Sequence, residues 1–179
     1  FDEGAKFTLT NAPIALRMGK INELAEKCSS EVIPADLTST EDIDNLYLKS
    51  KDFLDGKIDF ILHSVGMSPN VRKNKEYGDL NYEWLFKTLD VSAISFHKMM
   101  QIAEKNELLN SWSSIVGLSY IAAQRTFPFY SDMAEAKSLL ESIGVDCIEV
   151  SGDTRYDRVL EHKNNSTISN EILDQFTKE

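Results

Sequence analysis

Strand-like and helix-like stretches alternate along most of this 179-residue chain, and this alternation constrains its fold more than any other feature. Short runs rich in Val, Ile and Phe are typical of buried parallel strands, and the amphipathic stretches between them are typical of covering helices. The predicted fold class is therefore α/β. The expected strands are 6–10, 32–36, 58–64, 114–120 and 147–150, and the expected helices are 13–27, 39–54, 82–109 and 130–143.

Composition and charge narrow the class of protein. Hydrophobic residues make up 42% of the chain, which is enough for one buried core but too little for two large domains. Lys and Arg number 19 against 29 Asp and Glu, and the net charge of −10 excludes a chain-wide surface for nucleic acid or anionic lipid. No apolar run reaches the roughly 18 residues that a transmembrane helix needs. We therefore expect a soluble protein that binds neither nucleic acid nor membrane.

The cysteines and histidines exclude other kinds of site. Cys28 and Cys147 are too few for a disulfide framework or a four-ligand metal set, as is typical of a reduced cytoplasmic protein. His63, His97 and His162 lie far apart in the sequence, outside any metal-type cluster. The sequence therefore predicts a cytoplasmic protein with no metal site.

Candidate binding residues follow the predicted strands, because open α/β sheets bind ligands at the carboxyl ends of their parallel strands. Asp36 closes the strand 32–36, where its carboxylate can accept a hydrogen bond from a nucleotide's amino group or ribose hydroxyl. A helix cap or turn acid is an equally good interpretation. The run 63–66 closes the next strand, and its small residues let a flat cofactor approach the backbone. Turn-forming residues predict a loop over 67–79.

A tyrosine and a lysine share the last predicted helix. Tyr130 begins it and Lys137 follows seven positions later, about two turns away on the same side. An ammonium near a phenol lowers the cost of the phenolate, which is useful where an oxyanion develops. Spacing alone favours the alternative interpretation, a surface lysine with a half-buried core tyrosine.

Three segments together resemble a known family: 58–66, 118–120, and Tyr130 with Lys137. They are similar to the NADH-dependent enoyl-acyl-carrier-protein reductases of bacterial fatty acid synthesis, within the short-chain dehydrogenase/reductase superfamily. That family has six residues between its active tyrosine and lysine, and a second tyrosine ten positions upstream of the first. Tyr120, Tyr130 and Lys137 reproduce both spacings. The resemblance implies a Rossmann-like, doubly wound parallel sheet.

The resemblance also implies the residues that bind the cofactor NADH. Asp36 and Leu37 would contact its adenine. Ser64 and Val65 would line the cleft on the nicotinamide side, and Lys137 would hold the nicotinamide ribose.

The remaining implied roles concern the substrate, an acyl-carrier-protein thioester. Tyr130 would hydrogen-bond the thioester carbonyl oxygen and stabilise the enolate that forms when hydride reaches the β-carbon of the trans-2-enoyl chain. Tyr120 would line the same pocket and support substrate placement or protonation, and Ser68 matches a substrate-contact position. The family is normally a homotetramer, so we expect a homo-oligomer.

Parts of the family fold have no counterpart here, since the resemblance runs from about Gly4 to Ile143. The first strand and the glycine-rich turn that binds pyrophosphate would lie before Phe1, and the later C-terminal elements are missing. The sheet is therefore expected to be incomplete. It lacks its central strand between 6–10 and 58–64, which leaves two unpaired edges.

The segment 144–179 departs from the family. Its run 144–161 resembles a different enzyme, the lipid A Kdo transferase, so the expected organisation is a partial reductase domain over 1–143 and a divergent tail over 144–179. Three functions follow from the sequence: an enoyl-acyl-carrier-protein reductase, an inactive remnant of that fold, and a fragment related to the Kdo glycosyltransferase.

Overall fold

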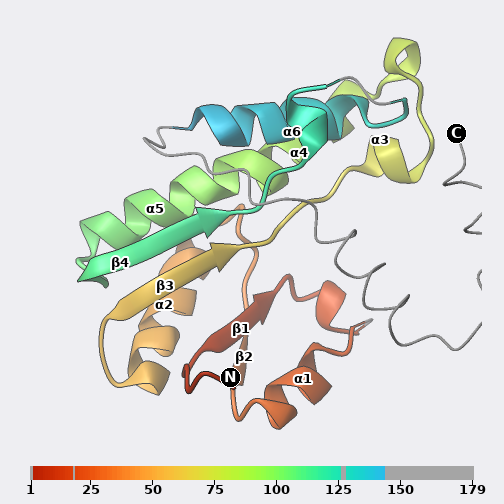
Figure 1. Cartoon of the computed structure of the whole chain (residues 1–179). Coiled ribbons are helices and arrows are strands. Elements are labelled where there is room, and N and C mark those ends of the chain that lie inside the picture. The colour runs from red at the N-terminus through yellow and green to blue at the C-terminus, as the bar shows by residue number, and fades with distance from the viewer. Residues whose placement is uncertain (1, 18, 126–127, 144–179) are drawn as a thin grey trace, which may run out of the picture. The chain divides into compact units, whose positions relative to one another are not determined.

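The computed structural model describes residues 2–17, 19–125 and 128–143 and confirms the α/β fold class (Figure 1). The predicted strand 147–150 and the tail 144–179 lie outside these residues. The described strands are β1 (Thr8–Asn11), β2 (Glu31–Pro34), β3 (Ile58–His63) and β4 (Leu109–Gly117).

Helices connect and cover these strands. None of those in the described ranges is both long and apolar enough to cross a membrane. The α-helices are α1 (Ile21–Lys27), α2 (Thr40–Leu54), α3 (Pro69–Arg72), α4 (Tyr82–Leu89), α5 (Ser95–Lys105) and α6 (Ser131–Ser142). A π-helical segment, η3 (Asp90–Ile94), joins α4 to α5, and single 3₁₀ turns form η1 (Ala15–Arg17), η2 (Tyr77–Asp79) and η4 (Ile121–Ala123).

The described strands form two separate parallel pairs rather than one sheet. β1 pairs with β2, with Leu9 opposite Val32, and β3 pairs with β4, with Ile61 opposite Ile115. The division falls between β1–β2 and β3–β4, where the sequence predicts a missing central strand. The incomplete Rossmann-like sheet is thus confirmed for the part of the chain that the structure describes.

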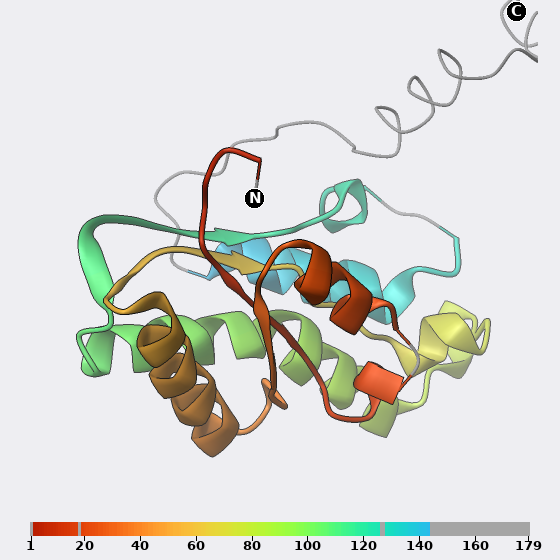
Figure 2. The same ribbon diagram turned by 90° about the horizontal axis from the view of Figure 1, so that it is seen from below.

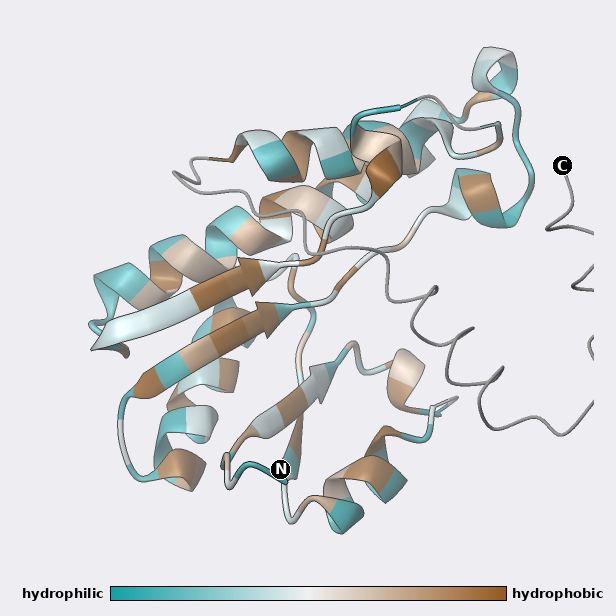
Figure 3. Ribbon diagram, viewed as in Figure 1, coloured by the Kyte–Doolittle hydropathy of each residue, from teal (hydrophilic) through white to brown (hydrophobic). Residues whose placement is uncertain are grey.

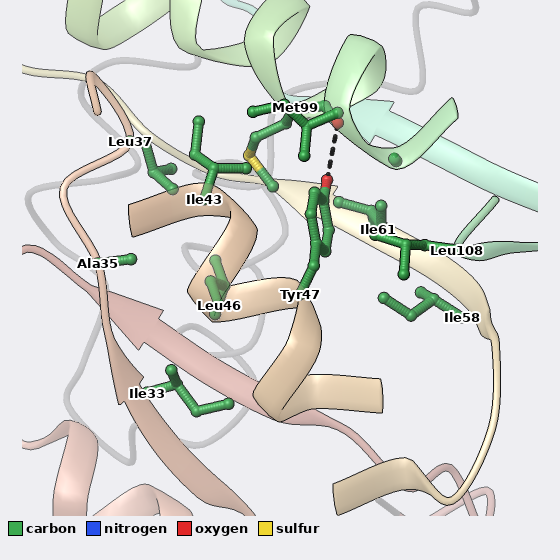
Figure 4. Packing of buried hydrophobic residues seen from close by; sticks show 12 residues of the cluster. Ile33, Ala35, Leu37, Ile43, Leu46, Tyr47, Ile58, Ile61, Met99 and Leu108 are labelled. Atoms are coloured by element: carbon green, nitrogen blue, oxygen red, sulfur yellow. Dashed lines mark hydrogen bonds between the residues drawn. The ribbon is translucent and has the colours of Figure 1, made fainter. Parts of the chain in front are cut away.

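One hydrophobic core serves both pairs. It joins Ile33 of β2 and Ile61 of β3 to the inner faces of α2 and α5, which lie next to each other in Figure 2. At its centre, the hydroxyl of Tyr47 on α2 donates a hydrogen bond to the main-chain oxygen of Met99 on α5, at 3.0 Å (Figure 4). Tyr47 is 3% exposed, so this bond is shielded from water.

The other face of β3–β4 is open among the described residues. Phe60 and Leu62 of β3 are 55% and 51% exposed, and Val116 of β4 is 38% exposed. Figure 3 shows hydrophobic colouring over much of β3 and near the carboxyl end of β4. A doubly wound sheet carries helices on both faces, whereas the described helices cover only one face of this pair.

The predicted helix over 82–109 is continuous but wrong at its end. It runs through α4, η3 and α5 in succession, and α5 ends at Lys105. Glu107 adopts a φ of 50°, a left-handed conformation that an α-helix cannot contain. β4 therefore begins at Leu109, five residues before the strand expected over 114–120.

Other elements also differ from their expected ranges. The helix expected over 13–27 is interrupted between η1 and α1, and the loop expected over 67–79 contains the short helix α3. α3 forms because Pro69 suits a first helical position and the side chain of Ser68 accepts a hydrogen bond from the main-chain N–H of Val71. β2 and β4 end at Pro34 and Gly117, so Asp36 and Tyr120 lie just beyond these strands rather than at their last positions.

Candidate active site

Lys137 on α6 is a buried lysine that joins the ends of two strands. Only 8% of it is exposed. Its Nζ donates hydrogen bonds to the main-chain oxygens of Leu118, at 2.7 Å, and Val65, at 3.3 Å, which follow β4 and β3. Burial lowers the pKa of the Lys137 ammonium to about 8. The structure therefore places this side chain at the carboxyl edge of the sheet and not on the surface.

Tyr120 and Tyr130 lie side by side. Their ring centroids are 5.4 Å apart and the ring planes meet at 34°. Tyr120 directly precedes η4, and Tyr130 directly precedes α6, where its main-chain oxygen accepts a hydrogen bond from Ala134. The short chain segments after β4 and before α6 thus bring the two tyrosines together, although they are ten positions apart in sequence.

Asp36 and Leu37 lie on the loop between β2 and α2, and their side chains point to different environments. The exposed carboxylate of Asp36 accepts hydrogen bonds from the main-chain N–H and the hydroxyl of Thr38, which lower the pKa of Asp36 below its ordinary value. These are the local contacts of a turn acid. The side chain of Leu37 belongs to the main core. The ammonium of Lys98 fixes the loop by donating to the oxygen of Thr38, at 2.8 Å.

Ser64, Val65 and Ser68 follow β3. Ser64 is exposed, and Val65 is half-buried with its side chain against the main core. Ser68 is 3% exposed, and its hydroxyl donates to a carboxylate oxygen of Asp132 at 2.7 Å while it caps α3. The structure thus commits this hydroxyl to neighbouring protein groups.

Three buried polar residues near these positions were missed from the sequence. Asp132 and Asn70 are fully buried and hydrogen-bonded to each other. His63, the last residue of β3, is 1% exposed, its Nε2 lies 2.8 Å from the hydroxyl of Ser95, and its ring meets Phe96 edge-on. Burial and, second, the charge of Lys137 lower the pKa of His63 to about 4. The available signals were the position of Asp132 in the first turn of a predicted helix and the place of His63 in the run 63–66 that closes a predicted strand.

Comparisons with known proteins agree with this arrangement. A family model described as "Enoyl-(Acyl carrier protein) reductase" matches residues 1–144. The NADH-dependent enoyl-[acyl-carrier-protein] reductase FabI of Salmonella typhimurium is 31% identical over 142 residues, which are 78% of this chain and 53% of that protein.

Solved structures give the same result. FabI from Alistipes finegoldii is 60% identical with a TM-score of 0.76, over 79% of this chain and 53% of that one. A FabI–NADH complex from the same organism has a TM-score of 0.77 at 60% identity, over 79% of this chain and 50% of that one. This chain thus spans about half the length of the relatives that it matches. The described fold and the match over residues 1–144 show that the chain belongs to the enoyl-(acyl carrier protein) reductase family.

Proposed function

We propose that this chain carries the tyrosine and lysine residues of an NADH-dependent enoyl-acyl-carrier-protein reductase of fatty acid biosynthesis. The single observation that carries the proposal is the buried ammonium of Lys137, held between the carbonyls that follow β3 and β4. A lysine is costly to bury, and a buried lysine with a lowered pKa at the carboxyl ends of parallel strands is a candidate functional group. The paired rings of Tyr120 and Tyr130, next to the start of the same helix, support the assignment.

The residues present fit two parts of a dinucleotide. An ammonium has three N–H donors, and two of those on Lys137 serve protein carbonyls, so one is left for a ribose hydroxyl. At the other end, Asp36 is exposed after β2, and Leu37 would present its main chain to the adenine because its side chain is in the core. Ser64 and Val65 would line the nicotinamide side. When bound, NADH supplies the hydride.

On the substrate side, Tyr130 is the proposed catalytic acid or hydrogen-bond donor. Its phenol would donate to the carbonyl oxygen of a trans-2-enoyl thioester and stabilise the negative charge that develops there. Tyr120 would pack against the acyl chain or the thioester and support Tyr130. Ser68 is a weaker candidate for substrate contact, because its hydroxyl already serves Asp132 and the α3 cap.

The proposal includes a cellular setting and an assembly. We place the reaction in the cytoplasm, on acyl-carrier-protein thioesters, and expect the chain to act as a homo-oligomer, with a homotetramer as the family pattern. The aromatic side chains of Tyr82 and Phe86 on α4 support self-association, because they are 71% and 66% exposed.

Calorimetric titration of the purified chain with NADH tests the proposal. We expect saturable binding that Lys137→Ala weakens by about 10- to 100-fold, the loss of one charge-assisted hydrogen bond. Lys105→Ala, which removes an exposed lysine at the end of α5, is the matched control and should leave the affinity unchanged. Absence of saturation at millimolar NADH, or equal weakening by both variants, would support the inactive-remnant hypothesis instead.

If NADH binds, turnover of a crotonyl thioester follows as loss of NADH absorbance. Tyr130→Phe should abolish this turnover while it leaves NADH affinity within about twofold, since the phenol would act on the substrate. Unchanged turnover in this variant would contradict the role of Tyr130.

The glycosyltransferase hypothesis rests on 144–161, which lie outside the described residues. It stays a prediction from the sequence.

A further inference from the structure

Asp132, in the first turn of α6, is a fully buried carboxylate. Its Oδ1 accepts a hydrogen bond from the hydroxyl of Ser68 at 2.7 Å. Its Oδ2 lies 2.9 Å from both the Nδ2 of Asn70 and the hydroxyl of Thr88. Moving a carboxylate out of water costs several kcal/mol, and such a group persists only where hydrogen bonds replace its hydration. Ser68 and Asn70 provide that replacement, and Thr88 adds to it although its one hydroxyl proton is shared with the main-chain oxygen of Trp84.

The side chain of Asn70 is itself fully used. Its Nδ2 donates to Asp132 and to the main-chain oxygen of Asn81, and its Oδ1 accepts from the main-chain N–H of Asn81 at 3.1 Å. The side chain of Asn81 then begins α4 by accepting a hydrogen bond from the N–H of Trp84. One carboxylate is therefore connected to the start of α3, to the start of α4 and, through Thr88, to the end of α4.

The same carboxylate defines how α6 sits in the fold. Asp132, Ala136 and Leu140 are spaced four residues apart and are all buried, so they form the inner face of the helix. The N-cap residue of α6, Tyr130, makes no side-chain capping bond, and Asp132 is the acidic residue of the first turn. A negative charge there is also stabilised by the positive end of the helix dipole.

We propose that Asp132 is a positioning residue of the candidate active site. Its carboxylate, held by donors from α3 and α4, fixes the rotation and the start of α6, so that Lys137 reaches the carbonyls at the ends of β3 and β4. This inference rests on the proposed function, since it assigns to Asp132 the placement of the group that would hold the nicotinamide ribose. Asp132 itself touches neither Lys137 nor the substrate in the proposed arrangement.

The pKa of the Lys137 ammonium indicates whether this group keeps its buried position. Its pKa is depressed to about 8 because the group is buried. If α6 shifts and the ammonium gains water, this pKa rises toward that of a free lysine. Removal of a nearby negative charge has the opposite effect and lowers the pKa of a lysine. The direction of the change therefore separates displacement of Lys137 from a simple loss of charge at Asp132.

The experiment is a pH titration of the lysine side-chain NMR signals of the full chain without NADH, with Lys137 assigned through Lys137→Arg. Asp132→Asn keeps the shape of the side chain but replaces one acceptor oxygen by an N–H2 donor, so that it cannot accept from Ser68 and from Asn70 at the same time. We expect it to raise the pKa of Lys137 by at least about half a unit. Glu135→Gln, on the same helix and with the same change of charge, is the matched control and should leave that pKa unchanged or slightly lowered, but not raised.

A Lys137 pKa that is unchanged or lowered in folded Asp132→Asn would overturn the proposal. If this variant does not fold, Ser68→Ala takes its place, because it removes the donor to Oδ1 and keeps the carboxylate. We expect a smaller rise in the Lys137 pKa with Ser68→Ala, and no rise would equally overturn the proposal. Failure of the wild-type chain to bind NADH would count against the proposed function alone, since this titration contains no cofactor.

Discussion

The two ends of the candidate site differ in how the protein holds them. At the Lys137 end, the functional side chain is 8% exposed and its hydrogen bonds go to main-chain oxygens of distant segments. At the Asp36 end, the carboxylate is exposed and bonds to Thr38, two residues away. A buried polar group that loses a partner cannot replace it with water, whereas an exposed one can. Substitutions at the Lys137 end should therefore change the free energy of unfolding and its dependence on pH. Substitutions at the Asp36 end should mainly change the affinity for NADH.

The largest effect is expected for Asn70→Ala. It removes a donor to Asp132 and leaves both main-chain groups of Asn81 without their partner. We expect the free energy of unfolding, measured by urea denaturation, to fall by about 3 kcal/mol. The matched control is Asn106→Ala, which breaks an exposed hydrogen bond of 2.7 Å to Asp44 and should cost less than about 0.5 kcal/mol. Similar losses of unfolding free energy in the two variants would contradict the difference that we expect between buried and exposed hydrogen bonds.

As the pH falls, the protein should first lose stability at the Lys137 end, through protonation of His63. Its pKa is lowered to about 4, so the unfolded chain binds more protons than the folded chain between about pH 4 and 6.5. The stability contribution is fully present above pH 6.5 and is lost as the pH falls to 4, at up to about 1.4 kcal/mol per pH unit. We expect a total loss of about 2 to 3 kcal/mol in urea denaturation series, and a flatter profile for His63→Gln.

Asp36 titrates at a lower pH than His63, so the pH dependence of stability distinguishes the two ends of the site. Because hydrogen bonds from Thr38 lower its pKa from 3.8, its contribution is present above that value and is lost only as the pH falls through the depressed pKa. A loss of stability above pH 4 that persists in His63→Gln would have to come from another group, and would contradict the assignment of that window to His63.

A medium effect is expected for Tyr47→Phe, in the core that joins the two ends. The variant removes the buried hydrogen bond to Met99, whose carbonyl lies within α5 and keeps its helical hydrogen bond. We expect the free energy of unfolding to fall by about 1 to 2 kcal/mol in the same denaturation assay. Tyr77→Phe, on a side chain that is 75% exposed, should change it by less than about 0.5 kcal/mol. Equal changes in the free energy of unfolding for the two variants would show that burial of the hydroxyl does not determine the loss of stability.

The smallest effect on stability is expected for Asp36→Asn. Its carboxylate is exposed, so we expect a change within about 0.5 kcal/mol in the free energy of unfolding. The affinity for NADH, measured by calorimetry, should nevertheless fall severalfold if Asp36 accepts a hydrogen bond from the nucleotide. A loss of stability close to that of Asn70→Ala, with unchanged NADH affinity, would reverse the proposed roles of the two ends.

Local sequence patterns predicted most elements, and their failures have identifiable causes. The helix over Thr40–Leu54 and the strand over Ile58–His63 match the expected ranges within one residue, because their apolar spacing reflects backbone geometry directly. The helix expected over 82–109 was too long, since periodicity does not reveal that Glu107 adopts a left-handed conformation and ends α5. Likewise, nothing local shows that Trp112 adopts a φ of 128° in β4 and stands fully exposed.

The sequence by itself determined the α/β class, the order of the elements and the helix of Lys137, which Tyr130 directly precedes. Each of these depends on spacing along the chain, which hydrophobic periodicity reports. Only the tertiary structure decided which polar groups are buried and what satisfies them. The donors to Asp132 come from Ser68, Asn70 and Thr88, which are 64, 62 and 44 positions away, and no local pattern encodes partners at that distance. The environment of a buried charge is set by chain segments that meet only on folding, because burial removes the water that would otherwise solvate it.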